Sequence, residues 1–120
     1  MQERRRYVRL NIALEITYSL PGAAEIQYKT FTKDISPNGA RFTIEKEMPK
    51  GSVVDLKIKI PTADQIIPVK AKIVWFRKDS QADKNTYDCG LEFISIPQDS
   101  TTIFFQYLCS LMYEQLKELK

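Results

Sequence analysis

Apolar residues that recur at every second position constrain the fold of this chain more than any other feature. This alternation is the period of a β-strand with one buried side. It occurs in six runs, at residues 12–20, 27–35, 40–44, 54–60, 69–75 and 87–93. Proline- and glycine-containing turns separate several of these runs, as at Pro21-Gly22 and Pro49-Lys50-Gly51. The pattern therefore predicts an all-β protein with six short strands.

Six alternating strands without intervening helices indicate an antiparallel sheet with one solvated face. Such a sheet must bury its apolar face against itself, so we expect a small barrel or sandwich. A chain of 120 residues is long enough for one modest core. We find no internal repeat and no domain boundary.

The C-terminal region, residues 98–120, has a different period. Its apolar residues fall at three- and four-residue steps, as in the stripe of an amphipathic helix. They are Ile103, Phe104, Tyr107, Leu108, Leu111, Met112 and Leu116. Two interpretations stay open: the helix covers the barrel, or it contacts a partner protein or a second copy of the chain, forming a dimer.

The composition argues against catalysis and metal binding. The chain has no histidine and only two cysteines, Cys89 and Cys109, which we expect to be small buried residues. No acid–base pair, metal-ligand set or cofactor motif is recognisable, so we expect no enzyme activity, no catalytic residue, no metal and no cofactor. The sequence holds neither a run of eighteen apolar residues nor a secretory h-region, so we expect a cytoplasmic protein without membrane insertion.

Residues 1–10 form a basic segment that we expect to be a flexible arm. It carries Arg4, Arg5, Arg6 and Arg9 against one glutamate, Glu3. Such a segment attracts polyanions weakly. Arg5 and Arg9 are four residues apart and point broadly the same way, and a guanidinium matches the O6/N7 edge of guanine bidentately.

The segment Asp34-Ile35-Ser36-Pro37-Asn38-Gly39 places a carboxylate, a hydroxyl and a glycine on a tight turn. Taken alone, it is an ordinary β-turn between two strands. Combined with the arginine pair it suits a guanine nucleotide, because a carboxylate accepts hydrogen bonds from the amino and imino groups of guanine.

The Arg5-x-x-x-Arg9 pair, the Asp34-x-Ser36-x-x-Gly39 turn and the late Gly90-Leu91-Glu92-Phe93 strand together resemble the PilZ domain family. The resemblance covers essentially all 120 residues. It implies a six-stranded antiparallel, split β-barrel (11–97) with a ligand-gripping N-terminal arm (1–10) and a C-terminal helix (98–120) in the same domain. It also implies a bacterial receptor for the second messenger cyclic di-GMP, which controls motility, exopolysaccharide or biofilm outputs through a protein partner.

Carried over to this chain, the resemblance implies that Arg5 and Arg9 hold the guanines and phosphates of the ligand. Asp34 and Ser36 hydrogen-bond a guanine edge, and Gly39 keeps the turn open for the ligand. The ligand is expected to order the arm against the barrel, which is a conformational switch.

Three further residues are weaker candidates for ligand binding. Arg4 and Arg6 lie outside the strict motif, although Arg4 could stack on a second ligand molecule. Trp75 could border the site, but a buried core position is the favoured interpretation.

Two alternatives compete with the receptor. Exposed lysines could bind single-stranded nucleic acid, although Lys57, Lys59, Lys70 and Lys72 alternate with core residues and not with exposed aromatic rings, so nucleic acid is not expected. A degenerate PilZ-like protein-interaction module is the other alternative, and the intact arginine motif argues against it.

Overall fold

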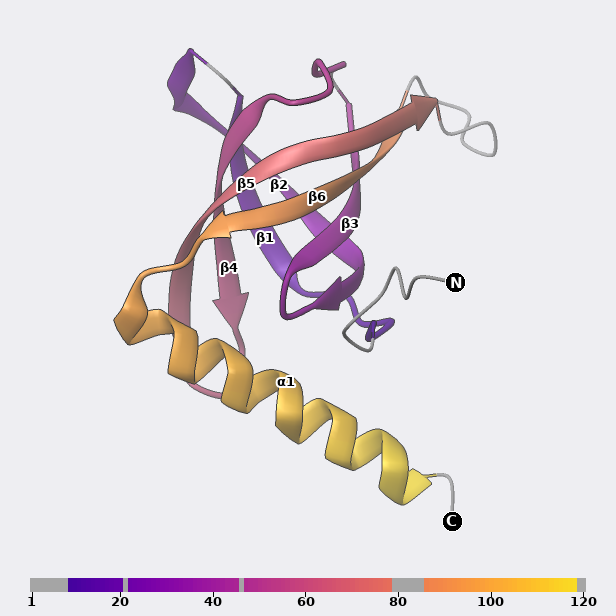
Figure 1. The fold of residues 1–120 in the computed structure, drawn as a ribbon, viewed down its shortest axis with the longest axis vertical. Helices are drawn as coiled ribbons and strands as arrows, with labels where there is room; N and C mark the ends of the chain where they lie inside the picture. The colour runs from indigo at the N-terminus through magenta and orange to yellow at the C-terminus, as the bar shows by residue number, and fades with distance from the viewer. Residues whose placement is uncertain (1–8, 21, 46, 79–85, 119–120) are drawn as a thin grey trace, which may run out of the picture.

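Six antiparallel strands and one helix make up the computed structural model, which describes residues 9–20, 22–45, 47–78 and 86–118. In chain order they are β1 (Glu15–Leu20), β2 (Ala23–Ser36), β3 (Gly39–Ile44), β4 (Val53–Ile60), β5 (Gln65–Lys78), β6 (Tyr87–Ser95) and α1 (Gln98–Glu118) (Figure 1). The six predicted strands and the helix are confirmed.

The strands close into a barrel in the order β1-β2-β3-β6-β5-β4. Every neighbouring pair is antiparallel, including β1 with β4, which closes the barrel. The predicted antiparallel barrel is therefore confirmed, and the sandwich alternative is wrong.

The core lies inside the barrel and follows the predicted alternation. On β4 the residues alternate strictly between exposed and buried along all eight positions. Side chains from all six strands meet in one cluster, together with residues of α1 and of the segment before β1. The alternation of the sequence thus predicted the buried face correctly.

Residues 12–14 were predicted as the start of the first strand, but β1 begins only at Glu15. These residues form an irregular segment that Thr32 holds in place. The Thr32 hydroxyl donates to the carbonyl of Ile12 (2.6 Å) and accepts from the amide of Leu14 (2.9 Å). Leu10 and Leu14 are fully buried, so their apolar character reflects packing against the core and not strand pairing.

The fifth strand begins earlier than predicted: β5 starts at Gln65 rather than at Val69, and it runs through Pro68. Proline lacks the amide that a central strand needs and is tolerated at an edge. β6 ends at Ser95, which pairs with Lys70, so β5 has no β6 partner at Pro68. At Pro68, β5 pairs with β4 alone, through Lys57, which explains why proline fits there.

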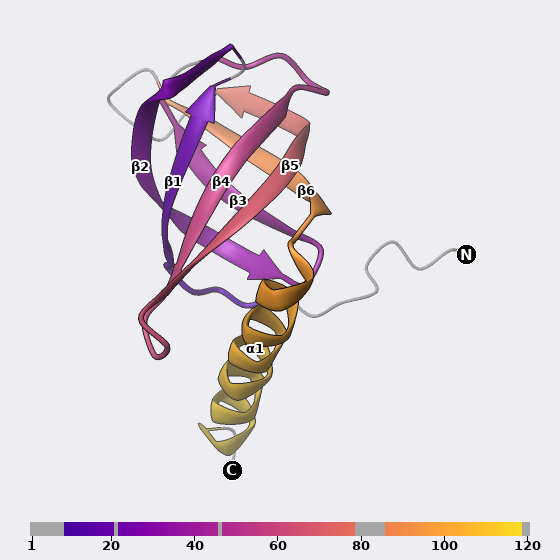
Figure 2. The same cartoon turned by 90° about the vertical axis from the view of Figure 1, so that its left-hand side faces the viewer.

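Helix α1 packs on the barrel through side chains between residues 103 and 112. Phe104, Tyr107 and Leu108 are buried, and the Phe104 ring meets Phe93 of β6 edge-on at 5.8 Å. The C-terminal end of the helix extends beyond the barrel in both views (Figures 1 and 2), and Tyr113 and Leu116 are more than half exposed. The interpretation that the helix covers the barrel is therefore confirmed for α1 as far as Met112. Within the described ranges, no helix is long and apolar enough to cross a membrane.

The two cysteines have different environments. Cys89 is fully buried in the barrel, and burial raises the pKa of its thiol to about 12. Cys109 is exposed, because it lies on the side of α1 that faces away from the barrel. The expectation of two buried cysteines is correct for Cys89 and wrong for Cys109.

Candidate ligand-binding site

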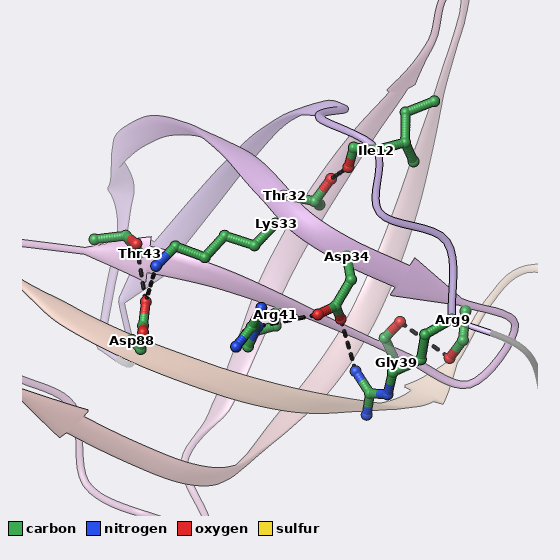
Figure 3. A network of polar contacts seen from close by, with 10 residues as sticks. Arg9, Ile12, Thr32, Lys33, Asp34, Gly39, Arg41, Thr43 and Asp88 are labelled. Carbon is green, nitrogen blue, oxygen red and sulfur yellow. Dashed lines mark hydrogen bonds and ion pairs between the residues drawn. The ribbon is translucent and has the colours of Figure 1, made fainter. Parts of the chain in front are cut away.

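Asp34 of β2 is a buried carboxylate held by two arginines on the outer face of the barrel. Its Oδ1 accepts a hydrogen bond from Arg9 Nη1 at 2.7 Å, and its Oδ2 lies 3.0 Å from Arg41 Nε (Figure 3). The second contact is an ion pair without hydrogen-bond geometry, since Arg41 Nε has no acceptor among the described residues. Each carboxylate oxygen thus faces one guanidinium.

The backbone explains why Arg9 reaches Asp34 across 25 positions of sequence. Leu10 and Ile35, the residues that follow Arg9 and Asp34, form an isolated antiparallel bridge. Its two hydrogen bonds run from Leu10 N to Ile35 O (2.8 Å) and from Ile35 N to Leu10 O (3.0 Å). This bridge, together with the buried Leu10 side chain, fixes the end of the arm beside the motif turn.

A row of residues crosses four adjacent strands at the level of Asp34. The pairing places Asp34 opposite Arg41, Arg41 opposite Gly90, and Gly90 opposite Trp75. Neighbouring strands lie about 4.8 Å apart, so the row from Asp34 to Trp75 spans roughly 14 Å. We call these four residues the cross-strand row.

Two β-bulges turn the ends of this row outward. The register shifts between Thr32 and Asp34 on β2 and between Ile73 and Trp75 on β5. An extra residue reverses the face on which the next side chain lies. Asp34 and Trp75 therefore point outward, although Thr32 and Ile73, two positions before them, are buried.

Gly90 lets the Trp75 indole lie close over β6. A Cβ atom at this position would lie only 2.3 Å from Trp75 Nε1, so no other residue fits without moving the ring. The Arg77 guanidinium lies 5.4 Å from the centre of the Trp75 ring, a cation–π contact that helps to hold the indole.

The row borders a hollow of about 380 Å³, lined by Arg9, Asn11, Asp34, Arg41 and Trp75. Its volume lies in the range of small-molecule sites, roughly 300–1,000 Å³. Guanidinium groups suit phosphates and the guanine O6/N7 edge, a carboxylate suits the guanine amino edge, and an indole suits a flat base. A second hollow, of about 390 Å³, lies mainly on β1, β4 and β5. In contrast to the hollow beside the row, neither an arginine nor an aromatic ring lines it.

A second buried carboxylate, Asp88 of β6, lies one row further along the same face. It accepts hydrogen bonds from Lys33 Nζ (2.6 Å) and Thr43 Oγ1 (3.1 Å) (Figure 3). Burial disfavours its charged form, but these hydrogen bonds prevail and hold the pKa of Asp88 below its usual value. Asp88 of β6 is therefore hydrogen-bonded to side chains of both β2 and β3 beside the site.

Of the predicted site residues, the structure brings Arg9, Asp34 and Trp75 together around the hollow. The core interpretation of Trp75 is wrong, because the bulge on β5 turns this half-buried side chain outward. Arg4, Arg5 and Arg6 lie outside the described residues.

Ser36 and Gly39 lie in the adjacent turn and do not line the hollow. Ser36 is buried, and its hydroxyl donates within the turn. The acceptors are Asn38 Oδ1 at 2.7 Å and, at the longer distance of 3.4 Å, the carbonyl oxygen of Gly39. A Cβ atom at Gly39 would lie 2.4 Å from the carbonyl oxygen of Leu91 on β6. In this state both residues shape the hairpin, and Gly39 lets β3 approach β6.

Sequence reasoning missed Arg41 and Asn11. Arg41 could have been found, because a two-residue turn that pairs Ser36 with Gly39 also places Asp34 opposite Arg41. Asn11 carries no such signal, since it lies in the irregular segment before β1.

Comparison with known proteins agrees with this geometry. The PilZ domain family matches residues 3–109. This chain belongs to the PilZ domain family. No match was found among curated proteins.

Several solved PilZ proteins have a similar fold. The Bacillus subtilis inhibitor of motility, MotI/DgrA, has a TM-score of 0.76 and 21% identity, over 97% of this chain and 53% of that chain. Escherichia coli YcgR in complex with c-di-GMP has a TM-score of 0.75 and 14% identity, over 98% and 50% of the two chains. The PilZ domain of YcgR with c-di-GMP has a TM-score of 0.69 and 15% identity, over 98% of both chains. This chain thus spans about half the length of the MotI chain and of the first of these YcgR chains.

Proposed function

We propose that this chain is a non-catalytic receptor for cyclic di-GMP that regulates a protein partner. One observation carries the proposal: Arg9 of the arginine motif donates directly to Asp34 of the turn motif, beside a hollow lined by a tryptophan. Membership of the PilZ domain family and the c-di-GMP complexes of the similar YcgR structures support it.

In the proposed complex, the ligand replaces the ion pair between Arg9 and Asp34. The amino and imino groups of a guanine donate to Asp34, while Arg9 and Arg5 bind guanine edges and phosphates. Trp75 borders the base, and Ser36 and Gly39 maintain the hairpin that positions Asp34. Exchange of partners at Asp34 keeps the buried carboxylate hydrogen-bonded, which avoids an unpaired buried charge.

We propose that this exchange is the switch. A ligand with two phosphates and two guanines can bridge Asp34 on the barrel and the arginines of residues 1–10. Amide hydrogen exchange in residues 3–10 tests this step, and we expect slower exchange with cyclic di-GMP than without it. Equal exchange rates in both states would rule out the switch.

Isothermal titration calorimetry with cyclic di-GMP, GTP and a short oligonucleotide tests the receptor itself. We expect binding of cyclic di-GMP, lost in Arg9→Ala and in Asp34→Ala. Lys59→Gln, on the exposed side of β4, removes a charge away from the row and is the matched control. Salt-dependent binding of every polyanion, insensitive to Asp34→Ala, would contradict the receptor and favour nucleic-acid binding.

We also propose that the partner, or a second copy of this chain, contacts the outer side of α1. Phe105, Tyr113 and Leu116 are exposed there, and aromatic side chains are enriched in protein interfaces. Sedimentation velocity of the wild type and of Tyr113→Ser/Leu116→Ser tests self-association. A dimer that persists in the double variant would place the contact elsewhere.

A further inference from the structure

Arg41 belongs to neither sequence motif, yet it is the arginine at the centre of the cross-strand row. Its Nε lies 3.0 Å from Asp34 Oδ2, and its side chain lines the hollow beside Trp75. Arg41 Nε has no hydrogen-bond acceptor among the described residues. Asp34 is thus the carboxylate that forms an ion pair with Arg41, while the charge of Arg41 also helps to lower the pKa of the neighbouring Asp88.

The two arginines on Asp34 differ in how firmly the fold holds them. Arg9 precedes the bridge of Leu10 with Ile35 and belongs to no strand. Arg41 lies within β3 and pairs with β2 on one side and with β6 on the other. A ligand can therefore displace Arg9 by moving the arm, whereas displacing the backbone of Arg41 would break the barrel.

We infer that Arg41 is a positioning residue that fixes Asp34 for guanine recognition while Arg9 exchanges its partner. The Asp34 side chain is only 8% exposed, so it needs a cation when Arg9 turns to the ligand. Arg41 holds Oδ2, which leaves Oδ1, the oxygen that Arg9 releases, to face the base. This inference rests on the proposed function and adds a specificity determinant to it.

The role predicts an effect on base selectivity and not only on affinity. Guanine presents an imino hydrogen and a 2-amino group on the edge that Asp34 would bind, whereas adenine has an acceptor nitrogen and no 2-amino group there. A correctly oriented carboxylate therefore favours cyclic di-GMP over cyclic di-AMP, because an unmatched buried acceptor rejects the wrong base. Loss of Arg41 should lower the affinity for cyclic di-GMP much more than that for cyclic di-AMP.

The test measures the Kd of both dinucleotides for wild type, Arg41→Gln, Arg41→Lys and the charge-matched control Lys59→Gln. Trp75 is the single tryptophan of the chain and lines the hollow, so its fluorescence can report binding. For Arg41→Gln we expect the selectivity for cyclic di-GMP to fall about tenfold or more, because the buried carboxylate loses the cation that holds Oδ2. Arg41→Lys keeps the charge and should recover part of the selectivity, and Lys59→Gln should keep all of it.

The other outcomes separate this inference from the proposed function. Unchanged binding in Arg41→Gln would overturn the role of Arg41 and leave the receptor intact. Equal losses for both dinucleotides would overturn it too, because a purely structural or electrostatic role does not distinguish the bases. If wild type bound no cyclic di-GMP, the proposed function would fail and this inference with it. Circular dichroism checks the fold of Arg41→Gln, and Arg41→Lys carries the test if the glutamine variant is unfolded.

Discussion

Two glycines, Gly39 and Gly90, shape the site by letting neighbouring groups approach the backbone. At Gly39 the neighbour is the backbone carbonyl of Leu91, and at Gly90 it is the Trp75 side chain. A backbone neighbour cannot rotate away, whereas a side chain can. The two positions should therefore respond differently to a methyl group.

Gly39→Ala should destabilise the free protein. The added Cβ would lie 2.4 Å from a carbonyl oxygen fixed in β6, so β3 or β6 must shift. We expect a loss of about 1–3 kcal/mol in the free energy of unfolding, measured by urea denaturation without ligand. Unchanged stability with weaker ligand binding would instead show that Gly39 serves the ligand directly.

Gly90→Ala should move Trp75 in the free protein. Its Cβ would overlap the indole nitrogen, and the ring can escape only by leaving its place over β6. We expect a changed Trp75 emission spectrum and weaker binding of cyclic di-GMP. Lys59→Gln, on the exposed side of β4 and away from the indole, is the control. Identical spectra of Gly90→Ala and wild type would disprove the close packing.

At the scale of elements, α1 consists of a part that packs on the barrel, as far as Met112, and a projecting C-terminal end. Phe104→Ala should cost about 3–5 kcal/mol, because its ring is fully buried against Phe93. Leu116→Ser should change stability by less than about 0.5 kcal/mol, since this side chain is exposed. Urea denaturation of both variants measures the difference. Similar losses would mean that the projecting end also supports the fold.

The elements were largely predictable from alternation and turn residues, and the exceptions have local causes. Ile12 and Leu14 pack on the core and Ala13 between them is exposed, so this irregular segment has the same alternation as a strand. The predicted fifth strand starts at Val69, whereas β5 already begins at Gln65 and runs through Pro68, where it has no β6 partner. Alternation also gives no information on which distant strands pair, such as β1 with β4.

The site was predictable only in part. Arg9 and Asp34 follow from the family motifs. The outward direction of Trp75 depends on the bulge between Ile73 and Trp75, which breaks the strict period of two without a glycine or proline to mark it. Arg41 follows from the hairpin register, once the turn at residues 36–39 is known.

At the scale of the whole molecule, the interior of the barrel should make stability sensitive to alkaline pH. Burial raises the pKa of both Cys89 and Tyr18 to about 12, from 9.0 and 10.0. Below pH 9 both groups are protonated in the folded and unfolded states, so their contribution is complete. Between pH 9 and about 12 the unfolded state loses these protons first, and the free energy of unfolding falls.

Each group contributes a slope of at most about 1.4 kcal/mol per pH unit in that window. Urea denaturation at pH 8 and pH 10.5 under reducing conditions measures the fall, and Cys89→Ala should reduce it. An equal fall in wild type and Cys89→Ala would mean that the thiol does not contribute.

The outside of the barrel has two walls. The cross-strand row lies on the wall of β2, β3, β6 and β5, and the other wall consists of β1, β4 and β5 (Figure 2). An NMR titration of the ¹⁵N-labelled protein with cyclic di-GMP tests most directly whether the row is the ligand site. We expect saturable shifts at Arg9, Asp34, Arg41, Gly90 and the Trp75 indole, with little change along β1 and β4. Absence of saturable shifts, or shifts confined to the wall of β1 and β4, would contradict the site.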